Sequence, residues 1–202
     1  MRFVVVVDTQ WDFMDAEGDL AVAGAEALIP AAEAFLRGLR PEETAGVLFT
    51  FDTHVPEVYA GSAEAEQFPP HCVKGSDGWA NVLATDLVDP AIPVHRLEKG
   101  VFDMWAEPGL TVEDARGSGP SYDRDAFFAA LRQRVDAVTV IGVAADYCVK
   151  WAVDGLLARG FRVTVPADLT RGIARQIREV AAEDFGGRVV VGDSHRSAGA
   201  GG

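Results

Sequence analysis

Short apolar runs alternate with helix-like segments along most of the chain, and this alternation constrains the fold more than any other feature. Runs rich in Val, Ile and Phe occupy residues 3–7, 45–51, 92–97, 137–143, 161–165 and 188–191. Helical patterns lie between them, at residues 25–39, 80–87, 125–134, 147–159 and 173–184. Strands that alternate with helices favour right-handed crossovers and a parallel sheet that is covered on both faces.

We therefore predict a three-layer, doubly wound α/β fold with a Rossmann-like sheet. The sheet is expected to hold six parallel strands in the order 3-2-1-4-5-6, with helices on both faces. A chain of 202 residues is long enough for one sizeable core, so residues 1–193 are predicted to form one domain. Residues 194–202 offer almost nothing to bury and are expected to be a disordered tail.

Composition excludes several classes of partner. The chain carries 31 acidic and 18 basic residues, a net charge of −13, which repels phosphate backbones and argues against nucleic acid. The apolar runs are too short to cross a bilayer, so no membrane partner is expected. The first run reaches Asp8 too early for a secretory signal, and a cytoplasmic location is the expectation. Cys72 and Cys148 form no CxxC pair, so a disulfide framework is not expected either.

Four polar side chains follow the first four strands of the predicted sheet. Asp8 ends the first run and Asp52 ends the second. Lys99 lies just past the third run, and Cys148 follows the fourth. Because ligands bind outside the carboxyl ends of the strands in a doubly wound sheet, we expect these four residues to converge on one rim. The two long segments at 52–78 and 98–122 also start from this rim, and long loops in a compact domain are usually functional.

A mixed set of oxygen and nitrogen donors lies in the first long segment. Asp52 and His54 leave a strand end at positions i and i+2, where alternate side chains point the same way. His71 follows two prolines that stiffen its approach. Asp, His and His suit Zn²⁺, Fe²⁺ or Mn²⁺. Further oxygen donors in the same segment are Glu57, Glu64 and Glu66.

Cys148 stands where a strand gives way to a helix. Such a turn puts a side chain beside the positive end of the helix, where a thiolate is favoured. Taken alone, a cysteine is more typical of a small buried hydrophobe. Asp8 and Lys99 on the same rim would supply the base and the cation that a thiol nucleophile needs. The backbone N–H groups of Ala144 and Cys148, at the turn into the helix, would form an oxyanion hole.

Taken together, these motifs resemble the nicotinamidase/pyrazinamidase branch of the isochorismatase-like cysteine hydrolases. The resemblance spans about residues 3–192, with the motifs in the order of the family. The D-x-Q-x-D-F start and the D-x-x-C-V turn mark the superfamily, and the D-x-H and P-P-H pair marks the branch. The segments that carry the resemblance are 7–13, 52–54, 68–75, 99–100 and 142–149.

The resemblance implies a catalytic triad of Asp8, Lys99 and Cys148. It also implies a cis peptide bond between Val143 and Ala144, which turns the Ala144 amide towards the oxyanion. The residues that the resemblance assigns to one divalent metal ion are Asp52, His54 and His71. In one subgroup a glutamate seven positions before the last histidine binds the metal as well. That offset falls on Glu64, and Glu66 stays open as the alternative.

The resemblance further implies that the substrate ring lies between aromatic side chains, here Phe13 and Phe68. Trp105 and Leu20 are expected nearby, although core packing is the alternative for all four. The chain departs from the family at two places. Phe68 stands where many relatives have Trp, and residues 143–145 read Val-Ala-Ala instead of a sequence with a small residue and Thr. Cys72 is expected only to pack.

The hypothesis is hydrolysis of nicotinamide to nicotinate and ammonia through a cysteine thioester, as in NAD salvage and pyridine nucleotide biosynthesis. Asp8 would take the thiol proton and Lys99 would stabilise the resulting anions. One divalent ion, Zn²⁺ with Fe²⁺ or Mn²⁺ as alternatives, would fix the ring through its nitrogen. The partner is thus a small-molecule carboxamide. Acceptance of analogues such as pyrazinamide and the oligomeric state, including a homo-oligomer, stay open.

Two alternatives remain. Another amide, ureido or carbamoyl hydrolase of the superfamily would need no metal and would usually offer Arg to a substrate carboxylate. A non-catalytic ligand-binding member is the second alternative, against which the joint presence of Asp8, Lys99 and Cys148 argues. Isochorismatase proper is the least expected activity, because it does not use this nucleophile.

Overall fold

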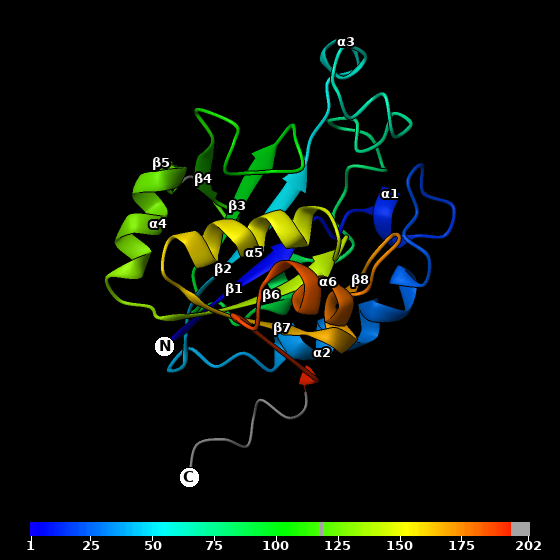
Figure 1. The fold of residues 1–202 in the computed structure, drawn as a ribbon. Coiled ribbons are helices and arrows are strands. Elements are labelled where there is room, and N and C mark those ends of the chain that lie inside the picture. Colours follow the sequence, from blue (N-terminus) through cyan, green and yellow to red (C-terminus); the bar gives the residue numbers. More distant parts are fainter. Residues whose placement is uncertain (118, 195–202) are drawn as a thin grey trace.

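A mostly parallel sheet runs through the centre of the protein (Figure 1), whose computed structural model describes residues 1–117 and 119–194. The strands pair in the order β5-β4-β3-β2-β1-β6-β7-β9, and β8 pairs with β6. Their bounds are β1 Arg2–Val7, β2 Thr44–Asp52, β3 Val94–Lys99, β4 Thr111–Asp114, β5 Tyr122–Asp123, β6 Ala137–Val143, β7 Arg162–Pro166, β8 Thr170–Arg171 and β9 Val189–Gly192. The parallel part, β3-β2-β1-β6-β7-β9, confirms the predicted order of six strands.

Two of the strands that the sequence did not predict, β4 and β5, lie at one edge of the sheet, and the third, β8, pairs with β6 inside it. β4 and β5 extend the sheet beyond β3 in antiparallel pairing, inside the second long segment. β4 reads Thr-Val-Glu-Asp, so it lacks the apolar run that marks a buried strand. An edge position suits these polar side chains, and Glu113 forms an ion pair with Arg96 on the neighbouring strand.

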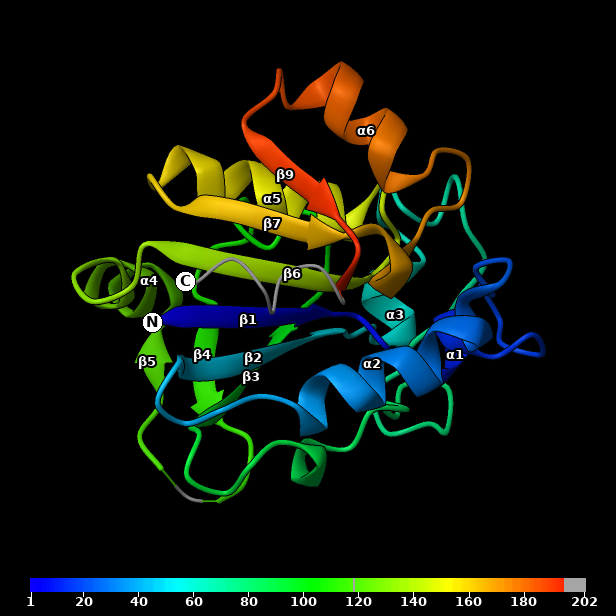
Figure 2. The same ribbon diagram turned by 90° about the horizontal axis from the view of Figure 1, so that it is seen from below.

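Helices cover both faces of the sheet, as predicted, and Figures 1 and 2 show α5 and α2 on opposite sides. Side chains of α4, α5 and α6 belong to a buried cluster on one face of the sheet, together with Phe3, Val5 and Val7 of β1. Those of α2 pack on the other, against Val4 and Val6. The α-helices are α1 Trp11–Met14, α2 Ile29–Arg37, α3 Pro56–Tyr59, α4 Arg124–Arg132, α5 Cys148–Ala158 and α6 Ile177–Asp184, and the 3₁₀ helices are η1 Ala25–Leu28, η2 Thr85–Leu87 and η3 Ala167–Leu169.

Two predicted helices are shorter than their sequence patterns. The pattern at 80–87 gives only η2, because its first residues pair with the chain beyond β1: Val82 N–H donates to Thr9 O, and Trp11 N–H donates to Ala80 O. The pattern at 173–184 becomes helical only at Ile177. Ahead of it, the Asp146 carboxylate accepts the backbone N–H groups of residues 173–175, which prevents a helical turn there.

The described chain ends at Ser194, whose backbone N–H and hydroxyl both donate to the Asp168 carboxylate. Residues 195–202 of the predicted tail lie outside the described residues. Over residues 1–117 and 119–194, every helix is too short or too polar to cross a membrane.

Phe128 of α4 should be one of the residues that stabilise the packing of α4 and α5. Its side chain is 1% exposed and meets Phe127, Trp105 and Phe161 at centroid distances of 5.4, 4.8 and 6.4 Å. We expect Phe128→Ala to lower the free energy of unfolding by about 3–5 kcal/mol, measured by urea denaturation. Val190→Ala, at an exposed position of β9, should change it by less than about 0.5 kcal/mol. Equal losses in the two variants would contradict this packing.

Candidate active site

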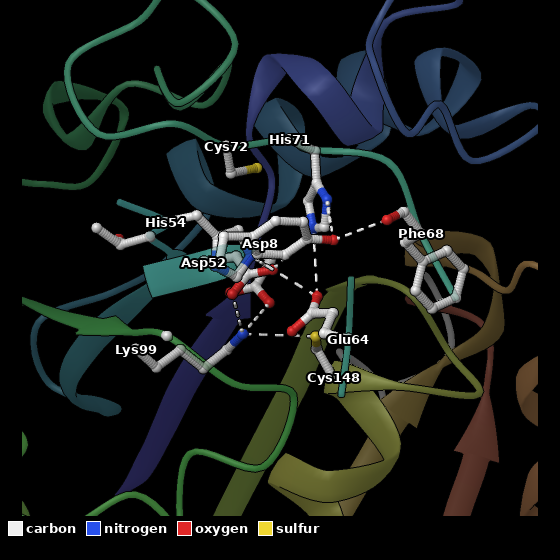
Figure 3. Close-up of polar contacts among 12 residues, drawn as sticks. Asp8, Asp52, His54, Glu64, Phe68, His71, Cys72, Lys99 and Cys148 are labelled. Atoms are coloured by element: carbon white, nitrogen blue, oxygen red, sulfur yellow. Dashed lines mark hydrogen bonds and ion pairs between the residues drawn. The ribbon is translucent and has the colours of Figure 1, made fainter. Parts of the chain in front are cut away.

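The four strand-end residues meet around one buried ammonium group (Figure 3). Lys99 Nζ lies 2.9 Å from Asp8 Oδ2 and 3.2 Å from Asp52 Oδ1. It also donates to the Cys148 sulfur at 3.5 Å. The carboxylates come from the ends of the adjacent strands β1 and β2, the lysine ends β3, and Cys148 begins α5. The predicted convergence on one rim therefore brings Lys99 into contact with the Cys148 thiol and with both carboxylates.

Burial and charge act against each other in this group. Burial by itself would lower the pKa of Lys99, but the carboxylates of Asp52 and Asp8 outweigh it and raise that pKa well above its usual value. Burial raises the pKa of the Cys148 thiol, and Lys99 opposes this effect without cancelling it. The position of Cys148 at the start of a helix predicted that its thiolate is favoured. Burial and the carboxylates of Asp8 and Asp52 instead favour the neutral thiol. The thiol hydrogen-bonds to Asp8, which is therefore placed to take its proton.

Two polar residues that the sequence did not single out hold Asp8 and Asp52 in place: Thr50 binds the side chain of Asp8, and Gln10 binds the backbone of Asp52. The Thr50 hydroxyl donates to Asp8 Oδ1 at 2.6 Å, which leaves Oδ2 facing Lys99. The Gln10 amide donates to Asp52 O at 2.7 Å, and its oxygen accepts Asp52 N–H at 2.7 Å. The D-x-Q pattern was the available signal for Gln10, but the pairing with a residue 42 positions away appears only in the fold.

Four buried donors gather beside this group. Asp52 Oδ2 lies 3.3 Å from Nε2 of both His54 and His71. Glu64 Oε1 lies 3.3 Å from His71 Nε2 and 3.7 Å from His54 Nε2. The four ligand atoms all lie within 4.8 Å of one another. Of the two glutamates left open by the sequence, Glu64 lies in this cluster and Glu66 is exposed.

The chemistry of the cluster fits a divalent cation. Both carboxylate oxygens of Glu64 and the Nε2 atom of His54 are buried and, within the described chain, have no hydrogen-bond partner. Two imidazoles with two carboxylates form a donor set that suits Zn²⁺, Fe²⁺ or Mn²⁺. A cation held by these atoms would satisfy groups that are otherwise costly to bury. The residues that the sequence assigned to a metal are thus together in space.

The protonation of the cluster also depends on its charges. Burial would lower the pKa of His71, but Asp52, Glu64 and the carbonyl of Pro69 raise it to about 10. The pKa of His54 is raised against burial by Asp52 and Glu64. Burial would raise the pKa of Asp52, yet Lys99 and the two histidines hold it well below its usual value. A metal ion would therefore compete with protons on both imidazoles.

Two amide groups face the nucleophile turn without backbone partners. The peptide bond between Val143 and Ala144 is cis, as the resemblance implied. Within the described residues, the N–H groups of Ala144 and Cys148 donate no hydrogen bond to the protein, whereas Ala144 O accepts N–H of Tyr147 and Val149. Free N–H donors at the start of a helix next to a thiol are the elements of an oxyanion hole.

Three of the predicted ring contacts lie near the site. Phe13 meets the His71 ring at a centroid distance of 5.3 Å. Leu20 packs with the buried group that contains Phe13 and Ala144. Phe68 meets Tyr147, the residue before the nucleophile, at 5.4 Å. Phe102, which the sequence did not single out, closes this aromatic group at 5.7 Å from Phe68 and 5.2 Å from Tyr147.

Trp105 packs elsewhere. Its indole N–H donates to Trp151 O at 3.0 Å, on α5 beyond the nucleophile. The ring packs on Phe128 at 4.8 Å, and the Arg159 guanidinium lies 3.9 Å from its centroid. A Cβ at Gly155 would overlap this indole, so the glycine makes room for it on α5. Trp105 therefore packs against α4 and α5 in this structure, which is the alternative that the sequence left open.

The chain belongs to the isochorismatase domain family, whose sequence profile matches residues 2–191. The nicotinamidase/pyrazinamidase of Mycobacterium tuberculosis is 30% identical over 193 residues, which cover 92% of this chain and 94% of that protein. The structure of PnC1 from L. infantum in complex with nicotinate is 25% identical, with a TM-score of 0.70 over 96% of this chain and 93% of that chain. The pyrazinamidase of Pyrococcus horikoshii in complex with zinc shares the fold, with 22% identity and a TM-score of 0.67 over 95% of this chain and 98% of that chain.

Zn²⁺ binding to the metal-free protein should release protons at neutral pH. His54 and His71 have raised pKa values there, and each must lose its proton to offer Nε2 to a metal. The apparent affinity for Zn²⁺, measured by chelator competition, should therefore rise from pH 6.5 towards about pH 10.

The raised pKa values of His54 and His71 also determine how the stability of the metal-free protein changes with pH. A raised histidine pKa adds stability below the unfolded value of 6.5, and the contribution from His71 is lost as the pH rises through about 10. The melting temperature of the metal-free protein should therefore decrease over this interval. A zinc affinity and a melting temperature that are both independent of pH would contradict the described cluster.

Proposed function

We propose that this protein hydrolyses nicotinamide to nicotinate and ammonia through a thioester on Cys148. The observation that carries the proposal is the contact of one buried lysine, Lys99, with the thiol, with Asp8 and with the metal-site residue Asp52. A nucleophile and a metal cluster joined in this way suit a substrate with a carboxamide and a ring nitrogen a few ångströms apart. The family membership and the nicotinamidase/pyrazinamidase of M. tuberculosis support an amidohydrolase that acts on non-peptide amides.

In the first half of the reaction, Asp8 takes the proton of the thiol and the sulfur attacks the carboxamide carbon. Lys99 stabilises the negative charge on the sulfur and on Asp8 as the proton moves. The oxyanion of the tetrahedral intermediate accepts hydrogen bonds from the N–H groups of Ala144 and Cys148. Asp8 then returns the proton to the departing nitrogen, so that ammonia leaves and the acyl group stays on the sulfur.

In the second half, Asp8 accepts a proton from a water molecule that attacks the thioester carbon. The carbon–sulfur bond breaks, the thiol is restored with the proton from Asp8, and nicotinate leaves. Throughout, Phe13 and Phe68 would hold the ring from its sides and exclude water from the reacting carbon. The same carboxylate thus acts as base and then as acid in each half.

A divalent metal ion, when bound by Asp52, His54, Glu64 and His71, would fix the ring through its pyridine nitrogen and withdraw electron density from it. Zn²⁺ is the expected ion, with Fe²⁺ and Mn²⁺ as alternatives. The zinc complex of the P. horikoshii pyrazinamidase, which shares the fold, is consistent with this assignment. The nicotinate complex of PnC1 from L. infantum supports a pyridine ring as ligand.

Cys148→Ala should abolish ammonia release from nicotinamide, because it removes the sulfur that is proposed to carry the acyl intermediate. The fold and the binding of nicotinamide should be kept, since Cys148 fills a small volume at the start of α5. A coupled ammonia assay and calorimetric titration measure the two effects. The control is Cys72→Ala, which removes the other thiol of the chain and should retain turnover. Appreciable ammonia release by Cys148→Ala would refute the nucleophile assignment.

Removal of metal should weaken binding of the ring and identify the substrate class. Ammonia release is compared for nicotinamide, pyrazinamide and a ureido acid, in chelator-treated protein and after addition of Zn²⁺, Fe²⁺ or Mn²⁺. We expect hydrolysis of nicotinamide that is lost with the chelator and restored by one of the ions. Full activity in the metal-free protein would refute the role of the metal. Preference for the ureido acid would favour a ureido or carbamoyl hydrolase instead.

A further inference from the structure

Tyr59 is turned into the protein from an otherwise exposed helix. It ends α3, which lies at the outer end of the molecule (Figure 1) and between His54 and Glu64 in the sequence. Its side chain is 4% exposed, whereas the neighbouring Val58 is 73% exposed. The phenol oxygen lies 3.1 Å from Phe68 O and 3.0 Å from Pro69 O. Carbonyl oxygens only accept hydrogen bonds, so the phenol is the donor to this pair of carbonyls.

The Tyr59 ring contacts both histidines of the cluster. Its centroid lies 4.4 Å from that of His54, at an interplanar angle of 56°. The His71 ring stands edge-on to it at 5.5 Å and 88°. A ring packed in this way limits rotation of both imidazoles about their side-chain bonds. Orientation of a metal-binding imidazole by its neighbours is a large part of what determines the affinity of such a site.

The Pro69 carbonyl connects the phenol to the tautomer of His71. His71 Nδ1 lies 2.8 Å from Pro69 O, and a hydrogen bond to a carbonyl requires the proton to be on Nδ1. In neutral His71 the lone pair is then on Nε2, the atom that faces Asp52 and Glu64. The phenol and the imidazole thus share one carbonyl acceptor. By donating to this pair of carbonyls, Tyr59 fixes the backbone that presents both His71 and Phe68.

We propose that Tyr59 is a positioning residue whose hydroxyl group orients both the imidazoles of the metal site and the side chain of Phe68. This inference rests on the proposed function. Phe68 would line the substrate ring, and its own carbonyl is one of the two acceptors. Loss of the hydroxyl would therefore loosen metal binding and ring binding together. The chemical step at Cys148 would be unaffected, because Tyr59 touches neither the thiol, Asp8 nor Lys99.

The test compares Tyr59→Phe with Val58→Ala, an exposed position on the same helix. Tyr59→Phe keeps the ring against His54 and removes only the hydroxyl. We expect its Zn²⁺ affinity, measured without substrate by chelator competition, to fall about 10-fold or more. In the zinc-loaded variant the KM for nicotinamide should rise several-fold, and kcat should stay within about two-fold of wild type. Tyr59→Leu, which also removes the ring, should lower the zinc affinity further.

A purely structural role makes a different set of predictions. It would lower the melting temperature of the metal-free protein and leave the zinc affinity and KM of the folded variant at wild-type values, which would overturn the inference. A several-fold fall in kcat with KM unchanged would also overturn it. If the wild-type protein binds Zn²⁺ and hydrolyses nicotinamide, and Tyr59→Phe has the same zinc affinity and KM, the role of Tyr59 is rejected and the proposed function stands. Wild-type protein that does neither would reject the proposed function together with this inference.

Discussion

The buried ammonium of Lys99 is the interaction on which the rest of the site depends. A lysine that is 2% exposed is tolerable only with opposite charge in contact, and two carboxylates lie 2.9 and 3.2 Å away. The parallel register supplies this contact directly, because Asp52 pairs with Lys99 across β2 and β3, and Asp8 follows the last paired residue of β1. Removal of either carboxylate would leave the positive charge of Lys99 only partly neutralised inside the protein. Catalytic geometry and stability therefore depend on the same three side chains.

The same arrangement raises the pKa of the Cys148 thiol and therefore favours its neutral form. A helix start and a cation stabilise a thiolate, but burial and the negative charges of Asp8 and Asp52 raise the pKa of Cys148 further than Lys99 lowers it. In the proposed reaction, proton transfer to Asp8 would therefore accompany the attack by the Cys148 sulfur, since a preformed thiolate is disfavoured. A thiol in this state is also less prone to adventitious oxidation and alkylation. In that reaction, activation of the thiol would depend on a substrate whose developing oxyanion accepts hydrogen bonds from the amides of Ala144 and Cys148.

The apolar runs predicted the parallel strands because a strand that is buried on both faces has a continuous Val-rich sequence. The order of these strands was predicted from the doubly wound fold class. The polar edge strand β4 carries no such signal, and the segment at 80–87 pairs with the chain beyond β1 through contacts that no local pattern reveals. Asp52, His54 and His71 were recognisable as a donor set from their chemistry and short spacing, whereas Glu64 came from the family resemblance and lies with them in space. Trp105 was not assignable, because its packing on Gly155 depends on where α5 lies, and Gln10 acts through a partner 42 positions away.

Asp52 links the two halves of the site through its separate oxygens. Oδ1 contacts Lys99, and Oδ2 lies between the two histidines at 3.3 Å from each. A cation bound at Oδ2 would reduce the negative charge that the Asp52 carboxylate offers to Lys99. The positive charge of Lys99 would then act more strongly on the Cys148 sulfur, which lies 3.5 Å from Lys99 Nζ. Gln10 accepts the backbone N–H of Asp52 and donates to its carbonyl, which fixes the point on β2 from which the carboxylate extends. In the proposed site, the charge around the Cys148 sulfur is thus connected to the occupancy of the donor cluster through the carboxylate of Asp52.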